Sequence, residues 1–180
     1  MSMTFFRELE TCRLKLINIS LEDREFIYQL FSDDTVNRYL FDAEPVIDIS
    51  EADEIIKFYL QPEPREQHRW VLNRKADGVK LGTCGFHCWD KARRCCDIGY
   101  DLLPEHWGNG YMNEAIQAIL EFAKTEMEIR HIQACIYPDN QASIRLANKH
   151  GFLFSGIMKD EIFRGKAYPH KVLTLDYLKM

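Results

Sequence analysis

The stretch HWGNGYMNEA, residues 106–115, places two glycines directly before the start of a helical pattern. Because glycine has no Cβ, Gly108 and Gly110 leave the backbone open to a bulky anion. The N-terminus of a helix presents unpaired N–H groups and a partial positive charge, which together favour a phosphate. The spacing therefore indicates a phosphate or diphosphate site here. The alternative is a tight strand-to-helix turn that needs positive φ angles.

The motif matches neither of the two common nucleotide-binding patterns. A Walker motif ends in Gly-Lys-Ser/Thr, and this stretch does not. A Rossmann fingerprint needs a further glycine, and its strand belongs to a parallel unit. The strand before residue 106 instead closes a run of three neighbouring strands. Any phosphate bound here belongs to a different cofactor class.

A second cluster, CGFHCWDKARRCC at residues 84–96, holds four of the six cysteines beside His87. Such a cluster raises the question of zinc, but no C-x-x-C pair is present. Cys95 and Cys96 are adjacent, so on a strand they point to opposite faces. We therefore expect no metal, and we expect mostly buried, apolar cysteines. A zinc-stabilised interaction module is the alternative, and metal analysis of protein purified without chelator tests it.

Length and composition favour a single globular domain. The chain has 180 residues, 46% of them hydrophobic and 28% charged. We expect one domain over residues 11–178 with an extension at residues 1–10. No apolar run approaches the roughly 18 residues that cross a bilayer, and the start does not resemble a secretory signal. We therefore expect a cytoplasmic protein with reduced thiols and no membrane partner.

The charge balance bears on partners. The formal net charge is −5, which argues against nucleic acid and is compatible with a cationic partner. Acidic residues gather between residues 31 and 54, where Asp33, Asp34, Asp42 and Glu44 can attract an amine. The alternative is that these carboxylates decorate exposed helices and caps.

Hydrophobic periodicity predicts a mixed α/β layer rather than an all-β or all-helical class. The expected order is a strand, two or three helices, three strands, a helix, a strand, a helix and two strands. Strands are expected at residues 12–19, 68–75, 79–89, 95–103, 131–137, 152–159 and 170–178. Helices are expected after Ser20, within residues 32–41, from Ser50, after Gly110 and over residues 141–150.

The predicted core follows from the same pattern. Trp70, Phe86, Tyr100 and Phe152 should lie on strands. Ile116, Ile119 and Leu146 should pack from helices onto the sheet.

Several motifs, in the right order, resemble one known family. Trp107-Gly108-Asn109-Gly110-Tyr111-Met112 is similar to the pyrophosphate-binding motif of the GNAT N-acetyltransferases. It is closest to the Trp-Gly-x-Gly-Tyr-Ala pattern of the RimJ/RimL-type branch, which acetylates protein N-termini. DIGYDLLPEHW resembles the fourth strand of that family, and NQASIRLANKHGF its Asn-x-x-Ser…Lys-x-Gly-Phe segment. TCRLKL resembles its opening strand and residues 156–178 its closing hairpin, so the resemblance runs from about Thr11 to Leu178.

The resemblance implies an α/β (α+β) fold, with a mixed, mostly antiparallel, seven-stranded sheet and helices on both faces. The fourth and fifth strands, residues 95–103 and 131–137, should run parallel and splay apart around acetyl-CoA. Met112 departs from the pattern by replacing a small residue. It either turns into the core or narrows the approach to the diphosphate.

The family's chemistry is direct attack of an amine on the thioester of acetyl-CoA in a ternary complex. The resemblance assigns the diphosphate to the backbone from Trp107 to Asn113. It assigns the orienting backbone groups to Leu102 and Leu103, opposite Ile136 and Tyr137. Asn140 would bind the pantetheine arm, or it is an ordinary N-cap. Arg145 and Lys149, at i and i+4, would reach the 3′-phosphate or form an exposed basic face.

The same resemblance suggests two proton routes. Ser143 would protonate the leaving thiolate, or it is an ordinary first-turn serine. Glu161 or Asp101 would help to deprotonate the amine, although Ile162 can occupy the position that matches Glu161. His87 and His170 are further proton acceptors, because their ordinary pKa lies near 6.5.

The acceptor is left open: a protein N-terminus, a polyamine, an aminoglycoside or an amino-acid-like amine. The protein is expected to act as a monomer or a homodimer. The alternative function is a non-catalytic module that binds acetyl-CoA as a sensor. Turnover with a panel of amines separates the two.

Overall fold

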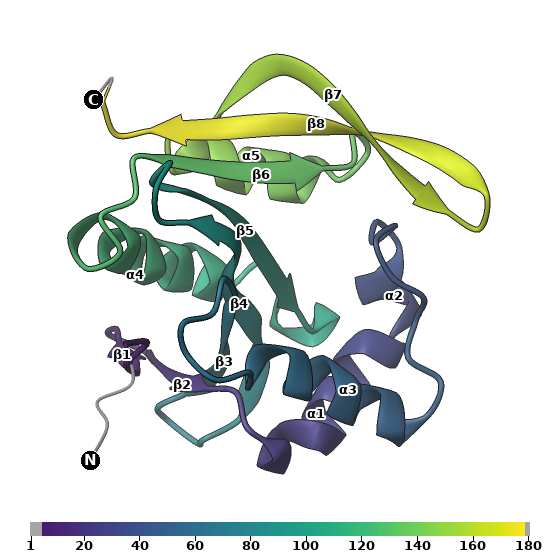
Figure 1. Cartoon of the computed structure of the whole chain (residues 1–180). Coiled ribbons are helices and arrows are strands. Elements are labelled where there is room, and N and C mark those ends of the chain that lie inside the picture. The colour runs from purple at the N-terminus through teal and green to yellow at the C-terminus, as the bar shows by residue number, and fades with distance from the viewer. Residues whose placement is uncertain (1–4, 179–180) are drawn as a thin grey trace.

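In a computed structural model of the chain, residues 5–178 are described, and they form one eight-stranded sheet with helices on both sides (Figure 1). The strands follow the order β1-β2-β3-β4-β5-β6-β8-β7. Their bounds are β1 Leu9–Glu10, β2 Leu14–Asn18, β3 His68–Arg74, β4 Lys80–Asp90, β5 Cys95–Leu102, β6 His131–Ile136, β7 Leu153–Phe163 and β8 Lys166–Asp176. The α-helices are α1 Arg24–Ser32, α2 Asp34–Asn37, α3 Ile49–Tyr59, α4 Tyr111–Thr125 and α5 Gln141–Lys149.

The predicted order of elements and fold class are confirmed, and the sheet carries one strand more than expected. The eighth strand, β1, is a two-residue segment that pairs with β2 at the sheet edge. It falls within residues 1–10, which the sequence suggested as an extension, and residues 1–4 lie outside the described part of the chain. Phe6 from the same segment is 2% exposed and belongs to the core.

Two details of the sequence-based prediction were wrong. Phe152 does not lie on a strand: it is buried one residue before β7 begins. Helix α3 starts at Ile49 rather than Ser50, because Asp48 is its N-cap and accepts a hydrogen bond from the Ser50 N–H at 2.8 Å. The predicted Ser20 cap is confirmed, since Ser20 and Asp23 form a capping box.

Two cores lie on opposite faces of the sheet. On one face, α4 packs through Ile116 and Ile119, with Leu146 of α5 partly buried against the same cluster. On the other face, α1 and α3 pack through Ile27 and Ile56 onto the sheet. We call the first the α4 face and the second the α1 face. Side chains from both the α4 face and the α1 face can therefore contact a ligand that lies between two strands of the sheet.

Strands β5 and β6 run parallel, as predicted, and they are the single parallel pair of strands within residues 5–178. Their pairing covers Cys95, Cys96 and Asp97 against His131, Ile132 and Gln133, and goes no further. Beyond these residues the two strands diverge, while β5 continues to Leu102. We call the unpaired stretch between β5 and β6 the gap; it lies along the part of β5 from which the chain continues to α4.

No helix within residues 5–178 is long and apolar enough to cross a membrane.

Candidate active site

The turn before α4 adopts the conformation that its glycines allow. Gly108 has φ of 75° and Gly110 has φ of 77°, both in the left-handed region that other residues rarely enter. Gly110 is the N-cap of α4. A Cβ at Gly108 would meet no atom within 4 Å, so the glycine answers a backbone requirement rather than a packing one. The positive φ angles confirm the tight strand-to-helix turn that the sequence allowed. Turns with such backbone conformations can also direct N–H groups toward an anion.

The start of α4 has unsatisfied backbone donors. The first bond within the helix runs from the Glu114 N–H to the Gly110 carbonyl at 3.1 Å. The N–H groups of residues 111–113 precede that bond and have no acceptor inside the helix. These donors and the helix dipole together favour a negative group at this end.

The side chains at this helix start are held elsewhere. Met112 is 6% exposed and packs in the core of the α4 face, so it turns inward. The Tyr111 ring lies under the Arg13 guanidinium, 4.5 Å from its centroid. Asn113 is half-buried, and its Oδ1 has no hydrogen-bond partner within residues 5–178.

The loop leading to α4 is pinned by its own side chains. The Trp107 indole N–H donates to the Leu102 carbonyl at 2.7 Å, which ties the loop back to the end of β5. Asn109 Nδ2 donates to the carbonyls of His106 and Trp107 at 3.2 and 3.0 Å. Half of the Trp107 side chain stays exposed. The loop is therefore ordered before any ligand arrives.

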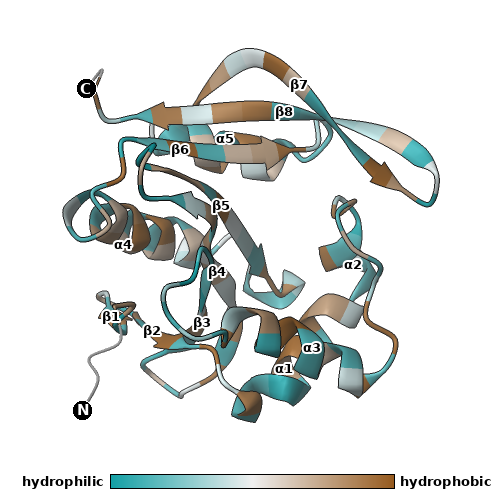
Figure 2. Ribbon diagram, in the orientation of Figure 1, coloured by the Kyte–Doolittle hydropathy of each residue, from teal (hydrophilic) through white to brown (hydrophobic). Residues whose placement is uncertain are grey.

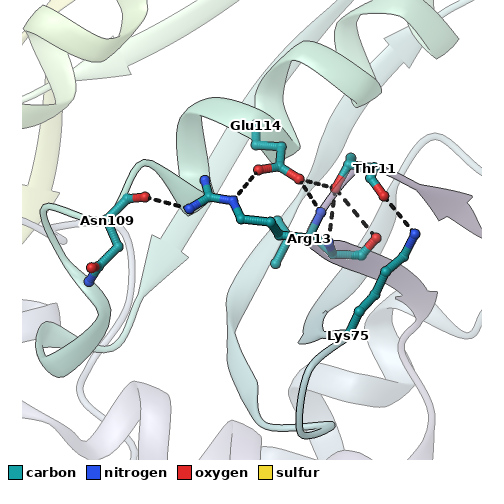
Figure 3. A network of polar contacts seen from close by, with 6 residues as sticks. Thr11, Arg13, Lys75, Asn109 and Glu114 are labelled. Carbon is teal, nitrogen blue, oxygen red and sulfur yellow. Dashed lines mark hydrogen bonds and ion pairs between the residues drawn. The ribbon is translucent and has the colours of Figure 1, made fainter.

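A polar network that the sequence did not indicate fixes the same loop to the segment just before β2 (Figure 3). Arg13 donates from Nε to Glu114 Oε2 at 2.7 Å and from Nη1 to the Asn109 carbonyl at 2.9 Å. Thr11 also bonds Glu114, and Lys75 Nζ reaches the Thr11 carbonyl at 2.6 Å. Burial acts to raise the pKa of Glu114, but the hydrogen bonds from Thr11 and Arg13 lower it overall. Asn109 and Glu114 lie about 100 positions after Thr11 and Arg13, so no local sequence signal connects the two segments.

The end of β5 offers one backbone donor from the predicted pair. The Leu103 N–H donates to the Leu81 carbonyl at 2.9 Å, so it is already used within the sheet. Successive residues of a strand direct their peptide groups to opposite sides. The Leu102 N–H therefore points away from β4, toward the gap between β5 and β6. The side chain of Leu103 is buried in the core of the α1 face.

Ser143 lies at the gap on the α4 face, together with a tyrosine that the sequence marked only as core. The Tyr100 hydroxyl is 2.7 Å from Ser143 Oγ and 3.3 Å from the Ser143 carbonyl oxygen. Burial raises the pKa of Tyr100 to about 12, so its hydroxyl keeps its proton. Asn140 caps α5, since its Oδ1 accepts from the Ser143 N–H at 3.2 Å. That capping bond is the ordinary role the sequence allowed for Asn140.

The two basic residues predicted near the 3′-phosphate lie on α5. Arg145 and Lys149 are exposed, one helical turn apart. Neither side chain forms an ion pair within residues 5–178. The Arg145 and Lys149 side chains can therefore both bind an anionic group that approaches from solvent.

Asp101 projects to the α1 face, where it forms a buried ion pair with Arg69 of β3. The Arg69 guanidinium also donates to Thr83 at 2.9 Å and to the Tyr59 hydroxyl at 3.3 Å. Burial raises the pKa of Asp101, and Arg69 opposes this rise. The side chains of Asp101 and Arg69 are 8% and 9% exposed, so this carboxylate is engaged in the interior.

Glu161 lies in a more open setting on the hairpin of β7 and β8. Its Oε1 is 2.9 Å from Lys159 Nζ, and its side chain is 26% exposed. Hydrogen bonding to Glu161 raises the pKa of Lys159. His87 Nε2 and Asp97 Oδ2 lie 3.9 Å apart, and the positive charge of Lys159 acts to lower the pKa of both groups. Glu161 thus belongs to a polar group that borders β5 and β6 on the α1 face.

His87 and His170 differ in burial. Burial lowers the pKa of His87, and Asp97 opposes this shift. His170 is 5% exposed, and its Nδ1 lies 2.7 Å from the Tyr168 carbonyl, which fixes the ring. His87 is the more accessible of the two.

The acidic residues between 31 and 54 have different partners. Asp33 caps α2 by accepting from the N–H groups of residues 35 and 36. Glu44 pairs with Arg164 at the tip of the hairpin, at 2.6 Å. Asp42 lies close enough to Asp101 to act on its pKa, so it is the member that faces the site. Asp34 is exposed in the first turn of α2.

The cysteines are all free thiols. Within the cluster of residues 84–96, Cys84 and Cys96 are buried and Cys95 is half-buried, but Cys88 is exposed, so the expectation of a buried cysteine was wrong for Cys88. Cys12, outside that cluster, is also exposed. Burial raises the pKa of Cys84 to about 12, which keeps it protonated. Within residues 5–178, no three His, Cys, Asp or Glu side chains are grouped so that they could hold a metal ion.

Residues 13–153 match the family model described as the acetyltransferase (GNAT) domain. An uncharacterized N-acetyltransferase of Bacillus subtilis, YoaA, is 33% identical over 172 residues, which cover 94% of this chain and 97% of that protein. The family predicted from the motifs is therefore confirmed.

Two solved structures have the same fold. RimL, the ribosomal L7/L12 alpha-N-protein acetyltransferase in complex with coenzyme A, matches with a TM-score of 0.84 at 19% identity, covering 94% of this chain and 98% of RimL. The spermidine N-acetyltransferase of Vibrio cholerae, in complex with CoA and spermine, matches with a TM-score of 0.81 at 19% identity and the same coverage of 94% and 98%. GNAT acetyltransferases use acetyl-CoA, and both of these neighbours carry coenzyme A. With the splayed strands, the open helix start and the family match together, the chain belongs to the GNAT family of N-acetyltransferases.

Proposed function

We propose that this protein transfers the acetyl group of acetyl-CoA to a primary amine in a ternary complex. The observation that carries the proposal is the juxtaposition of two features: the gap where β5 leaves β6, and the open N-terminus of α4 beside it. The first accepts a thioester arm between strands, and the second accepts its diphosphate.

The residues present fit acetyl-CoA at three points. The N–H groups of residues 111–113 are free of helix partners and suit the diphosphate. The Leu102 N–H, directed into the gap, suits the carbonyl oxygen on which charge develops. Arg145 and Lys149 suit the 3′-phosphate, because both are exposed cations on α5.

Two faces of the sheet supply two proton routes. The amine nitrogen bonds the acetyl carbon as the carbon–sulfur bond breaks. The amine gives its proton to Glu161 on the α1 face, and the sulfur takes one from Ser143 on the α4 face. Tyr100 supports Ser143, since its hydroxyl lies 2.7 Å from Ser143 Oγ and can resupply the proton. We assign Asp101 no proton transfer, because its carboxylate forms a buried ion pair with Arg69; that ion pair instead holds β5 against β3.

The acceptor is proposed to be a cationic amine that enters from the α1 face. Asp42, Asp97 and Glu161 give that side of the gap a negative field. Two proteins of the same fold are named for spermidine and for the ribosomal protein L7/L12, and both of those acceptors carry amines. Polyamines and protein N-termini are therefore the first acceptors to test, before aminoglycosides and amino acids.

The test is turnover with a panel of amines. Purified protein is mixed with acetyl-CoA and spermidine, N-terminal peptides, an aminoglycoside or single amino acids. Thiol release is followed with a colorimetric thiol reagent, and the acetylated product is identified by mass spectrometry. We expect release above the buffer rate with at least one amine. Tight acetyl-CoA binding without thiol release across the panel would contradict the proposal and favour a non-catalytic acetyl-CoA module.

A further inference from the structure

Strand β7 ends the sheet, and its outer edge is unusual for an edge strand. No strand within residues 5–178 pairs with that edge. Natural edge strands are commonly short or bear charges that block pairing with other chains. This one is long, with 11 residues, LFSGIMKDEIF, and it projects with β8 past α2 (Figure 1). Its charged side chains are confined to Lys159, Asp160 and Glu161, which carry both signs.

The strand also exposes apolar side chains. Ile157 is 59% and Ile162 is 69% exposed. Leu153, Phe154 and Met158 are exposed as well, and Figure 2 shows hydrophobic segments along the same strand. Exposed apolar clusters of this kind mark interaction surfaces.

The hairpin turn fixes which backbone groups of β7 face outward. Arg164 and Gly165 form a two-residue turn with φ of 51° and 74°, the signature of a type I′ hairpin. Phe163 and Lys166 close it as a bonded pair. Bonded pairs recur at every second residue of an antiparallel ladder, so the N–H and C=O groups of residues 159, 161 and 163 bond β8. The N–H and C=O groups of residues 158, 160 and 162 therefore point away from the sheet.

These outward groups can pair with a second copy of the same strand. A two-fold axis perpendicular to the sheet keeps each face on its own side and makes the strands antiparallel. With the axis at Asp160, residues 158, 160 and 162 of one copy bond residues 162, 160 and 158 of the other. All the outward groups of this segment are then satisfied.

Side-chain complementarity selects this register. Lys159 falls opposite Glu161 of the second copy, twice by symmetry, and Met158 falls opposite Ile162. Moving the axis to Lys159 sets two lysines against each other, and moving it to Glu161 sets two glutamates against each other. Opposite charges across a strand pair stabilise it and like charges destabilise it. The chosen register leaves a single unfavourable pair, Asp160 with its own copy.

We propose that two copies of this chain associate through β7 in this register, so that the two eight-stranded sheets become one. The partner is a second copy because the segment is complementary to itself in both charge and apolar contact. The α1 faces of both copies then lie on the same side of the joined sheet. Lys159 of each copy lies next to Glu161 of the other, and so the partner contributes a cation beside the group proposed to accept the amine proton.

The first test is cross-linking at the axis. In an antiparallel bonded pair the Cα atoms are about 5.5 Å apart, within the range of a disulfide. Asp160→Cys, in a background with the exposed Cys12 and Cys88 changed to serine, should therefore form a covalent dimer on mild oxidation. Lys159→Cys is the matched control, because its two copies are diagonal neighbours about 7–8 Å apart. Equal yields for the two variants, or none for Asp160→Cys, would overturn the proposal.

The second test is sedimentation across a range of concentrations. Wild type should be a dimer at micromolar concentration, and Ile162→Asp should raise the dimer dissociation constant by about 100-fold. Asp160→Ser should lower it, because a like-charge pair is removed. Ile47→Asp is the matched control, since Ile47 is 80% exposed but lies before α3, and it should leave the dimer unchanged. A monomeric wild type, or a dimer indifferent to Ile162→Asp, would refute the interface.

Discussion

Ser143 and Tyr100 come from α5 and β5, and their hydroxyl oxygens lie 2.7 Å apart beside the gap. Ser143→Ala should lower kcat by about 10- to 100-fold, the modest end of general acid catalysis, because a thiolate leaves readily. Tyr100→Phe should lower it less, since the serine hydroxyl remains. Acetyl-CoA affinity, measured by calorimetry, should hardly change in either. An unaltered rate and pH profile in Ser143→Ala would remove this residue from the mechanism.

Arg69 and Asp101 form the most deeply buried ion pair within residues 5–178. Removing one partner leaves an uncompensated charge in the interior, which costs about 3–5 kcal/mol. Arg69→Met should therefore lower the free energy of unfolding by that amount in urea titrations. Arg69→Met with Asp101→Leu should recover most of the loss. A double variant no more stable than Arg69→Met would show that packing, rather than charge, dominates here.

The residue-scale predictions succeeded where a local pattern carried the information. Ser143 and the Asn140 cap follow from four consecutive positions at the start of a helix. Arg13, by contrast, reaches Glu114 across 101 positions, and Arg69 reaches Asp101 across 32. Those partners depend on strand pairing and register, which no short stretch encodes. The roles proposed for Ser143, Glu161 and the backbone of Leu102 remain predictions.

At the scale of elements, the turn into α4 is the feature on which ligand binding depends. Gly110→Val puts a β-branched residue at φ of 77°, which costs about 1–3 kcal/mol and disturbs the donors of residues 111–113. Calorimetry should show no CoA binding to this variant. Gly78→Val is the control, since Gly78 has φ of 72° and open space around it but lies in a distant turn. Normal affinity in Gly110→Val would place the diphosphate elsewhere.

The order of elements could be read from the sequence because their hydrophobic periods are clear. The extent of the closing hairpin could not, since the two strands were expected at residues 152–159 and 170–178, whereas β7 continues to Phe163 and β8 begins at Lys166. Pro169 lies opposite Asp160, at a non-bonded pair with β7, and beyond the residues of β8 that pair with β6. Its missing N–H therefore costs no sheet hydrogen bond. Strand β1 has only two residues, too few to show any alternation.

At the scale of the whole molecule, His68 links stability to pH. Its ring stacks on Phe6 at 4.3 Å, and its nitrogens lie 2.9 Å from Asn18 Oδ1 and from Arg65 Nη2. The neutral ring can donate to Asn18 and accept from Arg65, but a second proton would face the guanidinium. Burial, with Arg65, lowers the pKa of His68 from 6.5 to about 3.

This lowered pKa predicts acid sensitivity. The unfolded chain takes up a proton near pH 6.5 and the folded chain does not, so the stability present above pH 6.5 is lost progressively as pH falls toward 3. The contribution is about 2 kcal/mol between pH 7 and pH 5. Urea unfolding at both values should show His68→Gln losing less stability than wild type over this interval. Identical losses in the two proteins would assign the acid sensitivity to other groups.

The central claim is that the gap between β5 and β6 holds the thioester and the amine together, with transfer occurring directly between them. Initial rates of thiol release, measured while acetyl-CoA and the best amine are varied against each other, test this most directly. Direct transfer predicts double-reciprocal lines that intersect, and no acetyl adduct on the protein after incubation with acetyl-CoA alone. Parallel lines together with an acetylated chain would mean a covalent enzyme intermediate and would contradict the account.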